Sequence, residues 1–260
     1  MHPFLAHQGV IPFAHRGGAS AYPENTIKAF QASFDLGFRH LETDVHLSKD
    51  GVLYAFHDNL LDRVTDQNGK ISDLTAPEID KARVQGTEPI PRLADLLTRF
   101  PEAHFNIDPK CDEVVSPLGD LIERMALFDR VCVTSFLDHR QARLRARFGA
   151  RLCTGMGRKS IARMIAASLH IPVGRFEEQC AQVPVRAHGI EVVTPRFIRA
   201  CHQHGIAVHV WTIDDPMEMK RLVLMGVDGI MTDQPEVLLS VLNAEPTSHR
   251  DPLSSTLKKV

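Results

Sequence analysis

Short apolar runs alternate with longer amphipathic segments along most of the chain. The runs have the length of buried strands, whereas the segments between them repeat apolar residues at helical spacing. Gly37, Gly149, Gly205 and Gly226 each stand between a helical segment and the next apolar run, as expected where a helix ends. The pattern predicts strands at residues 10–14, 38–45, 104–108, 131–134, 151–154, 181–184, 206–211 and 229–231.

The predicted helices lie between these strands. Asn25 or Thr26 can cap the first helix, in which Ile27, Phe30 and Phe34 recur at helical spacing. The same spacing predicts later helices over residues 93–100, 118–127, 137–148, 158–169, 195–204 and 217–225.

Repeated helix–glycine–strand punctuation over eight strands indicates an α/β fold of the (β/α)8, or TIM, barrel type. An open doubly wound sheet is the alternative, but the Gly-x-Gly-x-x-Gly turn expected after its first strand is missing. The pattern breaks over residues 46–91, which we interpret as an insertion between strand 2 and helix 2. We expect residues 1–244 to form one catalytic domain that includes this insertion, and residues 245–260 to form a polar tail.

Composition narrows the functional classes. A formal net charge of −2 argues against nucleic-acid binding, because proteins that bind nucleic acid are usually strongly basic. No apolar run is long enough to span a membrane. Five cysteines without a Cys-x-x-Cys motif argue against a disulfide framework or a zinc knuckle, so Cys132 and Cys153 are interpreted as buried thiols. The first residues do not read as a secretion signal, and a cytoplasmic location is expected. The oligomeric state stays open.

The polar residues that carry chemistry gather between positions 15 and 57. Glu42 and Asp44 alternate onto one face of a strand, where two carboxylates repel unless a cation lies between them. Carboxylate oxygens suit Mg²⁺ or Ca²⁺. His15 and His57 bracket the pair and can exchange protons near neutral pH, and Arg16 suits a phosphate or a carboxylate. Together these residues indicate phosphate-ester chemistry.

The same residues carry a family resemblance. The blocks His15-Arg16-Gly17-Gly18, Pro23-Glu24-Asn25-Thr26, Glu42-Thr43-Asp44 and His57-Asp58, in this order, resemble those of the glycerophosphodiester phosphodiesterases. The resemblance continues through residues 106–110, Trp211-Thr212 and residues 226–233, and so spans nearly the whole chain to about Leu242. It implies a barrel with a family insertion after the second strand.

The strand ends supply further candidates. Asp108 alternates onto the same side as Glu42 and Asp44, which makes it the third predicted metal ligand, although the family more often has Glu there. The alternative is a structural carboxylate paired with Lys110. Lys110 is, with Arg16, a candidate for binding phosphate, and Trp211 is interpreted as an apolar wall for the substrate's alcohol group.

Glu24 is expected to orient Arg16 or the first helix, without binding metal. His40 and His209 also face the lumen and are interpreted as hydrogen-bonded core histidines.

The resemblance implies metal-dependent hydrolysis of a small-molecule glycerophosphodiester to an alcohol and sn-glycerol 3-phosphate. His15 is assigned as general base and His57 as general acid, although the reverse assignment is open. Whether water or the glycerol 2-hydroxyl attacks first is also open. Two alternatives remain: a phosphodiesterase of the lysophospholipase D or sphingomyelinase D kind, and a barrel that binds phosphodiesters without turning them over.

Overall fold

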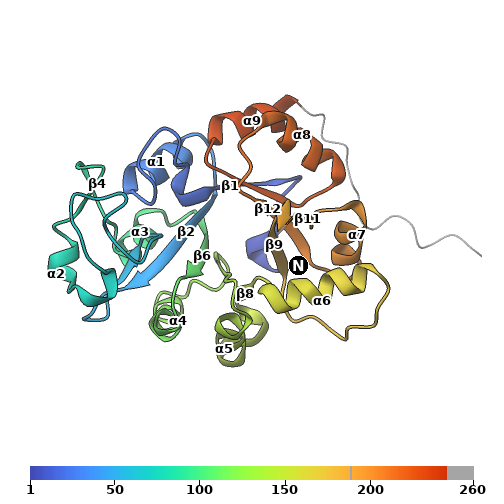
Figure 1. Ribbon diagram of the computed structural model, residues 1–260, viewed down its shortest axis with the longest axis horizontal. Coiled ribbons are helices and arrows are strands. Elements are labelled where there is room, and N and C mark those ends of the chain that lie inside the picture. Colours follow the sequence, from blue (N-terminus) through green and yellow to red (C-terminus); the bar gives the residue numbers. More distant parts are fainter. Residues whose placement is uncertain (188, 245–260) are drawn as a thin grey trace, which may run out of the picture.

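A computed structural model describes residues 1–187 and 189–244, and the predicted tail at 245–260 lies outside the described residues. Within this part of the chain, eight parallel strands form a nearly closed barrel surrounded by helices (Figure 1), which confirms the predicted fold class. The barrel strands are β1 (Ile11–Ala14), β2 (His40–Leu47), β6 (His104–Pro109), β7 (Val131–Val133), β8 (Cys153–Thr154), β9 (Cys180–Pro184), β12 (Ala207–Trp211) and β13 (Gly229–Thr232).

The helices pack on the outer face of the barrel strands. The longer ones are α1 (Ile27–Asp35), α3 (Leu93–Arg99), α4 (Val115–Arg124), α5 (Asp138–Phe148), α6 (Arg158–Ser168), α7 (Pro195–Gln203), α8 (Pro216–Met225) and α9 (Pro235–Ala244). Thr26 caps α1 by accepting a hydrogen bond from the Ala29 N–H, so the second of the two expected caps is used. None of the described helices is long and apolar enough to cross a bilayer.

The barrel closes unevenly. β2 and β6 pair continuously from His40–His104 to Val45–Pro109. By contrast, β8 and β9 meet at one isolated bridge between Gly155 and Cys180. The β8–β9 seam is therefore the weakly paired place in the barrel wall.

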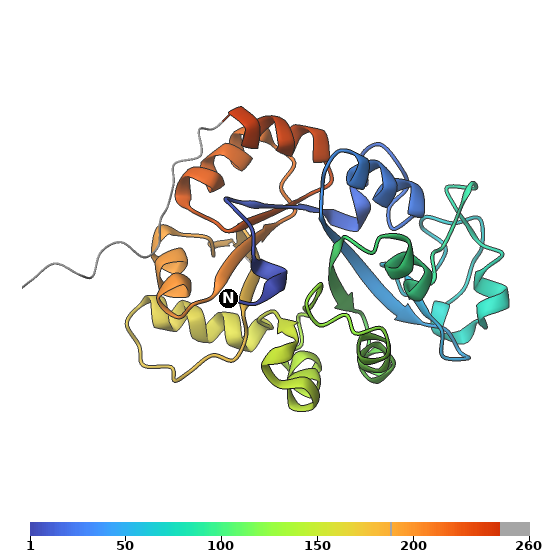
Figure 2. The ribbon, with the colours of Figure 1, turned by 180° about the vertical axis from the view of Figure 1, so that it is seen from behind.

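A short N-terminal 3-10 turn, η1 (Pro3–Leu5), lies across the end of the lumen where the strands begin (Figure 2). Phe4 is completely buried, and its ring lies 6.2 Å from Phe13 and 5.2 Å from the His40 imidazole. His40 Nε2 donates to the Phe4 carbonyl over 2.8 Å, so His40 is a hydrogen-bonded core histidine, as the sequence indicated.

Residues 46–91 extend from one side of the barrel (Figure 1). β2 continues to Leu47 and pairs antiparallel with β3 (Leu53–Ala55), after which the chain forms η3 (Ile71–Asp73), α2 (Ala76–Ile79), β4 (Arg83–Val84) and β5 (Glu88–Pro89). This segment has its own cluster of buried apolar residues, which includes Tyr54, Phe56 and Leu61. Its internal packing allows it to present side chains to the barrel mouth without a long helix.

Candidate active site

The predicted site residues gather where the barrel strands end. This is the face at which TIM barrels build their active sites. His15 and Arg16 follow β1, Glu42 and Asp44 lie on β2, Asp108 and Lys110 lie at the end of β6, Trp211 ends β12, and His57 follows β3.

His15 is held by the neighbouring last strand. β1 pairs with β13 through Ala14 and Thr232, so the next residue on each strand, His15 and Asp233, can meet. His15 Nδ1 donates to Asp233 Oδ1 over 2.8 Å, and its Nε2 lies 3.9 Å from Glu42 Oε2. Burial lowers the pKa of His15, but the hydrogen bond to Asp233 and the charge of Glu42 outweigh burial, and the net shift is upward.

The loop after His15 is tight. Arg16 adopts a left-handed backbone conformation with φ of 51°, which is uncommon for a residue with a side chain and recurs at functional sites. A Cβ on Gly18 would lie 2.4 Å from the Pro235 ring, so only glycine fits there. The resulting turn directs the Arg16 N–H to Glu42 Oε2 over 2.9 Å, while the guanidinium donates to Glu24 over 3.1 Å. Glu24 thus orients Arg16, as the sequence indicated.

Lys110 lies between two of the predicted metal ligands. Its ammonium is 2.6 Å from Asp44 Oδ1 and 2.9 Å from Asp108 Oδ2. Arg16 Nε approaches Asp44 Oδ2 at 3.2 Å. Burial alone would raise the pKa of Asp44, but the charges of Lys110 and Arg16 lower it. Any cation that contacted both aspartates would compete with Lys110 for their oxygens.

The other two carboxylates lack full compensation. Burial, followed by repulsion from Asp44, raises the pKa of Glu42 to about 7. Burial also raises the pKa of Asp108, whose Oδ1 is buried without a hydrogen-bond partner in the structure. Buried carboxylates with raised pKa values and an unpartnered oxygen are a donor set that fits a hard divalent cation. The type of donor therefore suits Mg²⁺ or Ca²⁺, although the oxygens of Glu42, Asp44 and Asp108 do not all lie within 4.8 Å of one another in the structure.

His57 reaches the site from the inserted segment. His57 Nδ1 donates to Asp58 Oδ1 over 2.5 Å, and Asp58 in turn accepts from the guanidinium of Arg63. This hydrogen bond from Arg63 is the main cause that lowers the pKa of Asp58 to about 2. His57, Asp58, Arg63 and Lys110 line one cavity of about 550 Å³. His15 and His57 therefore each donate a hydrogen bond from Nδ1 to a carboxylate.

A chain of ion pairs joins the inserted segment to the barrel. Arg63 Nη2 lies 2.7 Å from Glu24 Oε1, and the same oxygen accepts from Arg16 over 3.1 Å. Glu24 therefore connects Arg63 with Arg16.

An aromatic pair stands on another side of the mouth. Trp211 is partly exposed, and its ring lies 5.7 Å from that of Phe136 in an edge-to-face arrangement. Phe136 follows β7 and is 46% exposed, and Leu137 beside it is 40% exposed. The structure thus places Trp211 at the rim, where part of its surface is open to a ligand.

Reasoning from the sequence assigned no role to Asp233, Asp58 or Arg63. Asp233 stands at the end of the last strand, and barrel closure makes that strand the neighbour of the first, so its position was a usable signal. Asp58 adjoins a candidate histidine. Arg63 lies in an irregular part of the insertion, where no periodicity marks the direction of a side chain.

Comparison with known proteins agrees with this geometry. Residues 15–237 match the model of the glycerophosphoryl diester phosphodiesterase family. A probable glycerophosphodiester phosphodiesterase 2 from Mycobacterium tuberculosis is 36% identical over 250 residues, which cover 93% of this chain and 94% of that protein.

Solved structures show the same fold. A putative glycerophosphoryl diester phosphodiesterase from Silicibacter pomeroyi superposes with a TM-score of 0.78 at 21% identity, covering 94% of this chain and 98% of that one. A phosphodiesterase from Oleispira antarctica, solved in complex with the product sn-glycerol-3-phosphate, superposes with a TM-score of 0.75 at 20% identity over 90% and 96% of the two chains. The resemblance inferred from the sequence is confirmed: this chain belongs to the glycerophosphoryl diester phosphodiesterase family.

Proposed function

We propose that this protein hydrolyses glycerophosphodiesters to an alcohol and sn-glycerol 3-phosphate with the help of a divalent cation, Mg²⁺ or Ca²⁺. The observation that carries the proposal is the convergence of two histidine–carboxylate pairs, His15–Asp233 and His57–Asp58, on a mouth lined by buried carboxylates and cations. This combination supplies proton transfer and charge stabilisation in one place. The Oleispira antarctica structure, with its bound product, supports the same reaction class.

The cation would be held by Glu42, Asp44 and Asp108. When bound, the cation would act as a Lewis acid toward phosphate oxygens. Arg16 and Lys110 lie beside these carboxylates and add positive charge at the mouth, which stabilises negative charge that develops on the phosphate.

The histidines divide the proton transfers. His15 removes a proton from the attacking water or glycerol 2-hydroxyl, the new bond forms from that oxygen to phosphorus, and the bond from phosphorus to the alcohol oxygen breaks. If the 2-hydroxyl attacks, water then opens the resulting cyclic phosphate to give sn-glycerol 3-phosphate. His57 donates a proton to the departing alcohol. An in-line displacement needs base and acid on opposite sides, which entry of one histidine from the barrel and one from the insertion permits. Reversed roles are the competing assignment.

Trp211 and Phe136 form the apolar side of the mouth. We expect them to contact the alcohol group of the substrate. Exposed Phe136 and Leu137 also favour a second candidate, hydrolysis of lysophospholipids, because an acyl chain would cover apolar surface that is otherwise open to water.

Purified protein should be treated with a chelator and assayed for release of glycerol 3-phosphate from glycerophosphocholine, glycerophosphoethanolamine and glycerophosphoglycerol. We expect activity to disappear and to return with Mg²⁺ or Ca²⁺. Full activity of metal-free protein would contradict the proposal that the reaction needs a divalent cation. Release of glycerol 3-phosphate from none of the diesters, with headgroup release from lysophosphatidylcholine, would favour the second candidate, and binding without turnover of any substrate would show a non-catalytic barrel.

The Asp108→Asn variant tests the ligand set. It replaces one charged oxygen by a neutral one at the same volume, so the metal concentration for half-maximal activity should rise more than turnover at saturating metal falls. Asp112→Asn is the control, because Asp112 lies nearby but pairs with His139 and Arg140 on the surface. Background turnover of Asp108→Asn while metal still binds would show that Asp108 takes part in the chemistry.

A further inference from the structure

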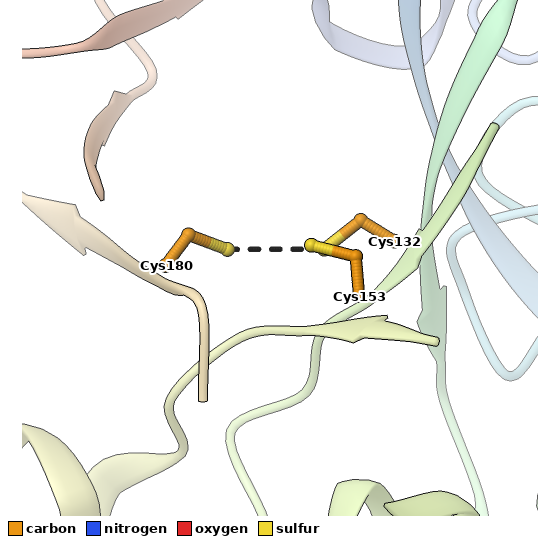
Figure 3. Close-up of side chains that lie close together, drawn as sticks. All are labelled: Cys132, Cys153 and Cys180. Carbon is orange, nitrogen blue, oxygen red and sulfur yellow. Dashed lines mark hydrogen bonds between the residues drawn. The ribbon is translucent and has the colours of Figure 1, made fainter. Parts of the chain in front are cut away.

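Three cysteines meet inside the barrel, well away from the predicted site residues in sequence. Cys132 lies on β7, Cys153 on β8 and Cys180 on β9, and each is completely buried. Figure 3 shows Cys132 and Cys153 approaching from one side and Cys180 from the other. The cluster thus spans the weakly paired β8–β9 seam.

The spacing of the sulfur atoms suits a shared metal ion. Cys132 Sγ lies 3.8 Å from Cys180 Sγ, and all three sulfurs lie within 4.8 Å of one another. A disulfide would need about 2.05 Å between sulfurs. Tetrahedral zinc–thiolate bonds of about 2.3 Å place two sulfurs about 3.8 Å apart. The observed separation therefore agrees with two ligands of one tetrahedral ion.

His209 provides an independent sign of a ligand. Its ring is completely buried on β12 beside the Cys180 thiol, yet its Nε2 has no hydrogen-bond partner in the structure. Its Nδ1 faces the Gln182 side-chain amide at 3.3 Å. An unpartnered imidazole nitrogen buried beside a thiol cluster costs free energy unless something binds it.

The neighbouring amides can select the required tautomer of His209. Gln182 and Asn106 exchange reciprocal side-chain hydrogen bonds of 2.8 and 3.1 Å, and turning both amides by 180° preserves that exchange. Gln182 Oε1 then accepts a hydrogen bond from the His209 Nδ1–H and leaves Nε2 free as a ligand, while the present 3.8 Å contact from Gln182 Nε2 to Cys180 Sγ is lost. In the structure His209 is not among the residues whose ligand atoms lie within 4.8 Å of one another, so its imidazole must turn toward the three sulfurs to bind the same ion.

We propose that Cys132, Cys153 and Cys180, with His209 as fourth ligand, bind one borderline-soft divalent cation of the Zn²⁺ class. Each thiol loses its proton to solvent on binding, so three thiolates, a neutral imidazole and the dication leave one net negative charge. No electron transfer is involved. All four ligands come from the protein, so the site is structural and leaves no open position for substrate.

The ion would close the barrel wall. Cys132 and Cys153 lie on one side of the seam, and Cys180 and His209 lie on the other, so coordination joins strands that share only one isolated bridge. We expect bound zinc to raise the melting temperature. Because η1 covers this end of the lumen, exchange of the ion should be slow in folded protein and fast during refolding.

Cobalt distinguishes this site from the carboxylates at the mouth. Reduced, metal-free protein should be refolded with one equivalent of Co²⁺, and we expect near-ultraviolet thiolate-to-cobalt charge transfer together with strong visible bands of tetrahedral Co²⁺. Both should disappear on adding Zn²⁺. Oxygen ligands such as Glu42 and Asp44 give no thiolate charge transfer, so its absence from the wild-type spectrum would overturn the proposal.

Two variants and a labelling experiment complete the test. Cys153→Ser should lose most of the charge transfer, whereas Cys201→Ser, which changes an equally buried cysteine on α7, should keep it. If Cys153→Ser does not fold, the cobalt spectrum of the wild-type protein still tests the proposal. Bound Zn²⁺ should protect Cys132, Cys153 and Cys180 from alkylation in mild denaturant far more than Cys111 and Cys201, which gain only from the stabilised fold. Equal labelling of all five with and without Zn²⁺ would contradict the site.

Discussion

His15 and His57 both bind a carboxylate through Nδ1, but different kinds of structure hold them. His15 follows a parallel strand with a hydrogen-bonded neighbour on each side, and its partner Asp233 comes from one of those neighbours. His57 follows β3, an outer strand whose ladder is with β2 and whose other edge has one isolated bridge, Tyr54–Arg92, and the partner of His57 is the next residue in the chain. The side chain of His15 is 17% exposed and that of His57 is 34% exposed.

The difference indicates what each region contributes. The barrel fixes His15 through the strand ladder, so, with His15 as the proposed base, we expect the geometry of attack to change little from substrate to substrate. The segment around His57 is held by a backbone hydrogen bond from the Phe56 N–H to the Asp44 carbonyl, by a side-chain hydrogen bond from His46 Nε2 to the His57 carbonyl, and by exposed ion pairs. Exposed ion pairs are weak, so, with His57 as the proposed acid, we expect the side that faces the leaving group to adjust to different alcohols.

Truncating each histidine should give the largest contrast. General acid–base catalysis contributes roughly 10²- to 10⁴-fold, and a general acid matters most when the leaving group is poor. His57→Ala should therefore abolish most hydrolysis of a choline or alkyl diester but retain much more activity on a p-nitrophenyl diester. His15→Ala should impair both substrates similarly, because the nucleophile needs activation in each.

The same pair of substrates also exposes a wrong assignment. If His15→Ala is the variant rescued by the p-nitrophenyl leaving group, the roles of base and acid are reversed. Equal losses for both variants on both substrates would show that the histidines mainly bind phosphate. Circular dichroism of each variant serves as the control for folding.

Replacing the two carboxylate partners should have smaller effects. Asp233→Asn and Asp58→Asn keep the shape but remove the charge that orients each imidazole, and we expect losses of roughly 10- to 100-fold, the range found for carboxylates that orient metal-bound histidines. The loss of activity should be larger for Asp233→Asn. The positive charge of Arg63 already offsets part of the charge of Asp58, so removing the Asp58 charge changes the surroundings of His57 less.

The pH–rate profile separates the two substitutions further. Asp233 raises the pKa of His15, and a base with a raised pKa is inactive at pH values below it. Removing this carboxylate lowers the pKa of His15, so the acid limb of the profile should move to lower pH in Asp233→Asn and stay in place in Asp58→Asn. An unmoved limb in Asp233→Asn would mean that His15 is not the base.

These expectations rest on a fold that the sequence predicted well, because barrel strands and their glycine stops leave a regular pattern. All eight barrel strands were anticipated within a few residues. Helix α9 was not, although Val237, Leu238 and Val241 repeat at helical spacing directly after Pro235. The motif around Asp233 had directed attention to the preceding strand.

Contacts between distant strands were harder to anticipate. Asp233 reaches His15 only because the barrel closes, and the cysteine cluster forms across a seam between residues 21 to 48 positions apart, so no spacing motif marks it. Lys110 was expected to bind phosphate, with pairing to Asp108 as the stated alternative; the structure shows the pair with Asp108 and a further pair with Asp44, which was not expected. Alternation indicates which face a side chain occupies, but it does not say which partner the side chain finds there.

The smallest predicted effect concerns the link between the two regions. Arg63 connects Asp58 of the insertion with Glu24 of the barrel, and its side chain is 49% exposed. Exposed ion pairs contribute about 0.2–1 kcal/mol, so Arg63→Ala should lower kcat/KM by at most about fivefold. If the link positions His57, the loss should be visible with the choline diester and nearly absent with the p-nitrophenyl diester. Arg92→Ala is the matched control, because Arg92, the residue directly after the insertion, pairs with Asp80 inside the insertion rather than with Glu24. A similar loss in both variants would show that Arg63 only stabilises the insertion, whereas a loss confined to Arg63→Ala and to the poor leaving group would show that Arg63 acts through His57.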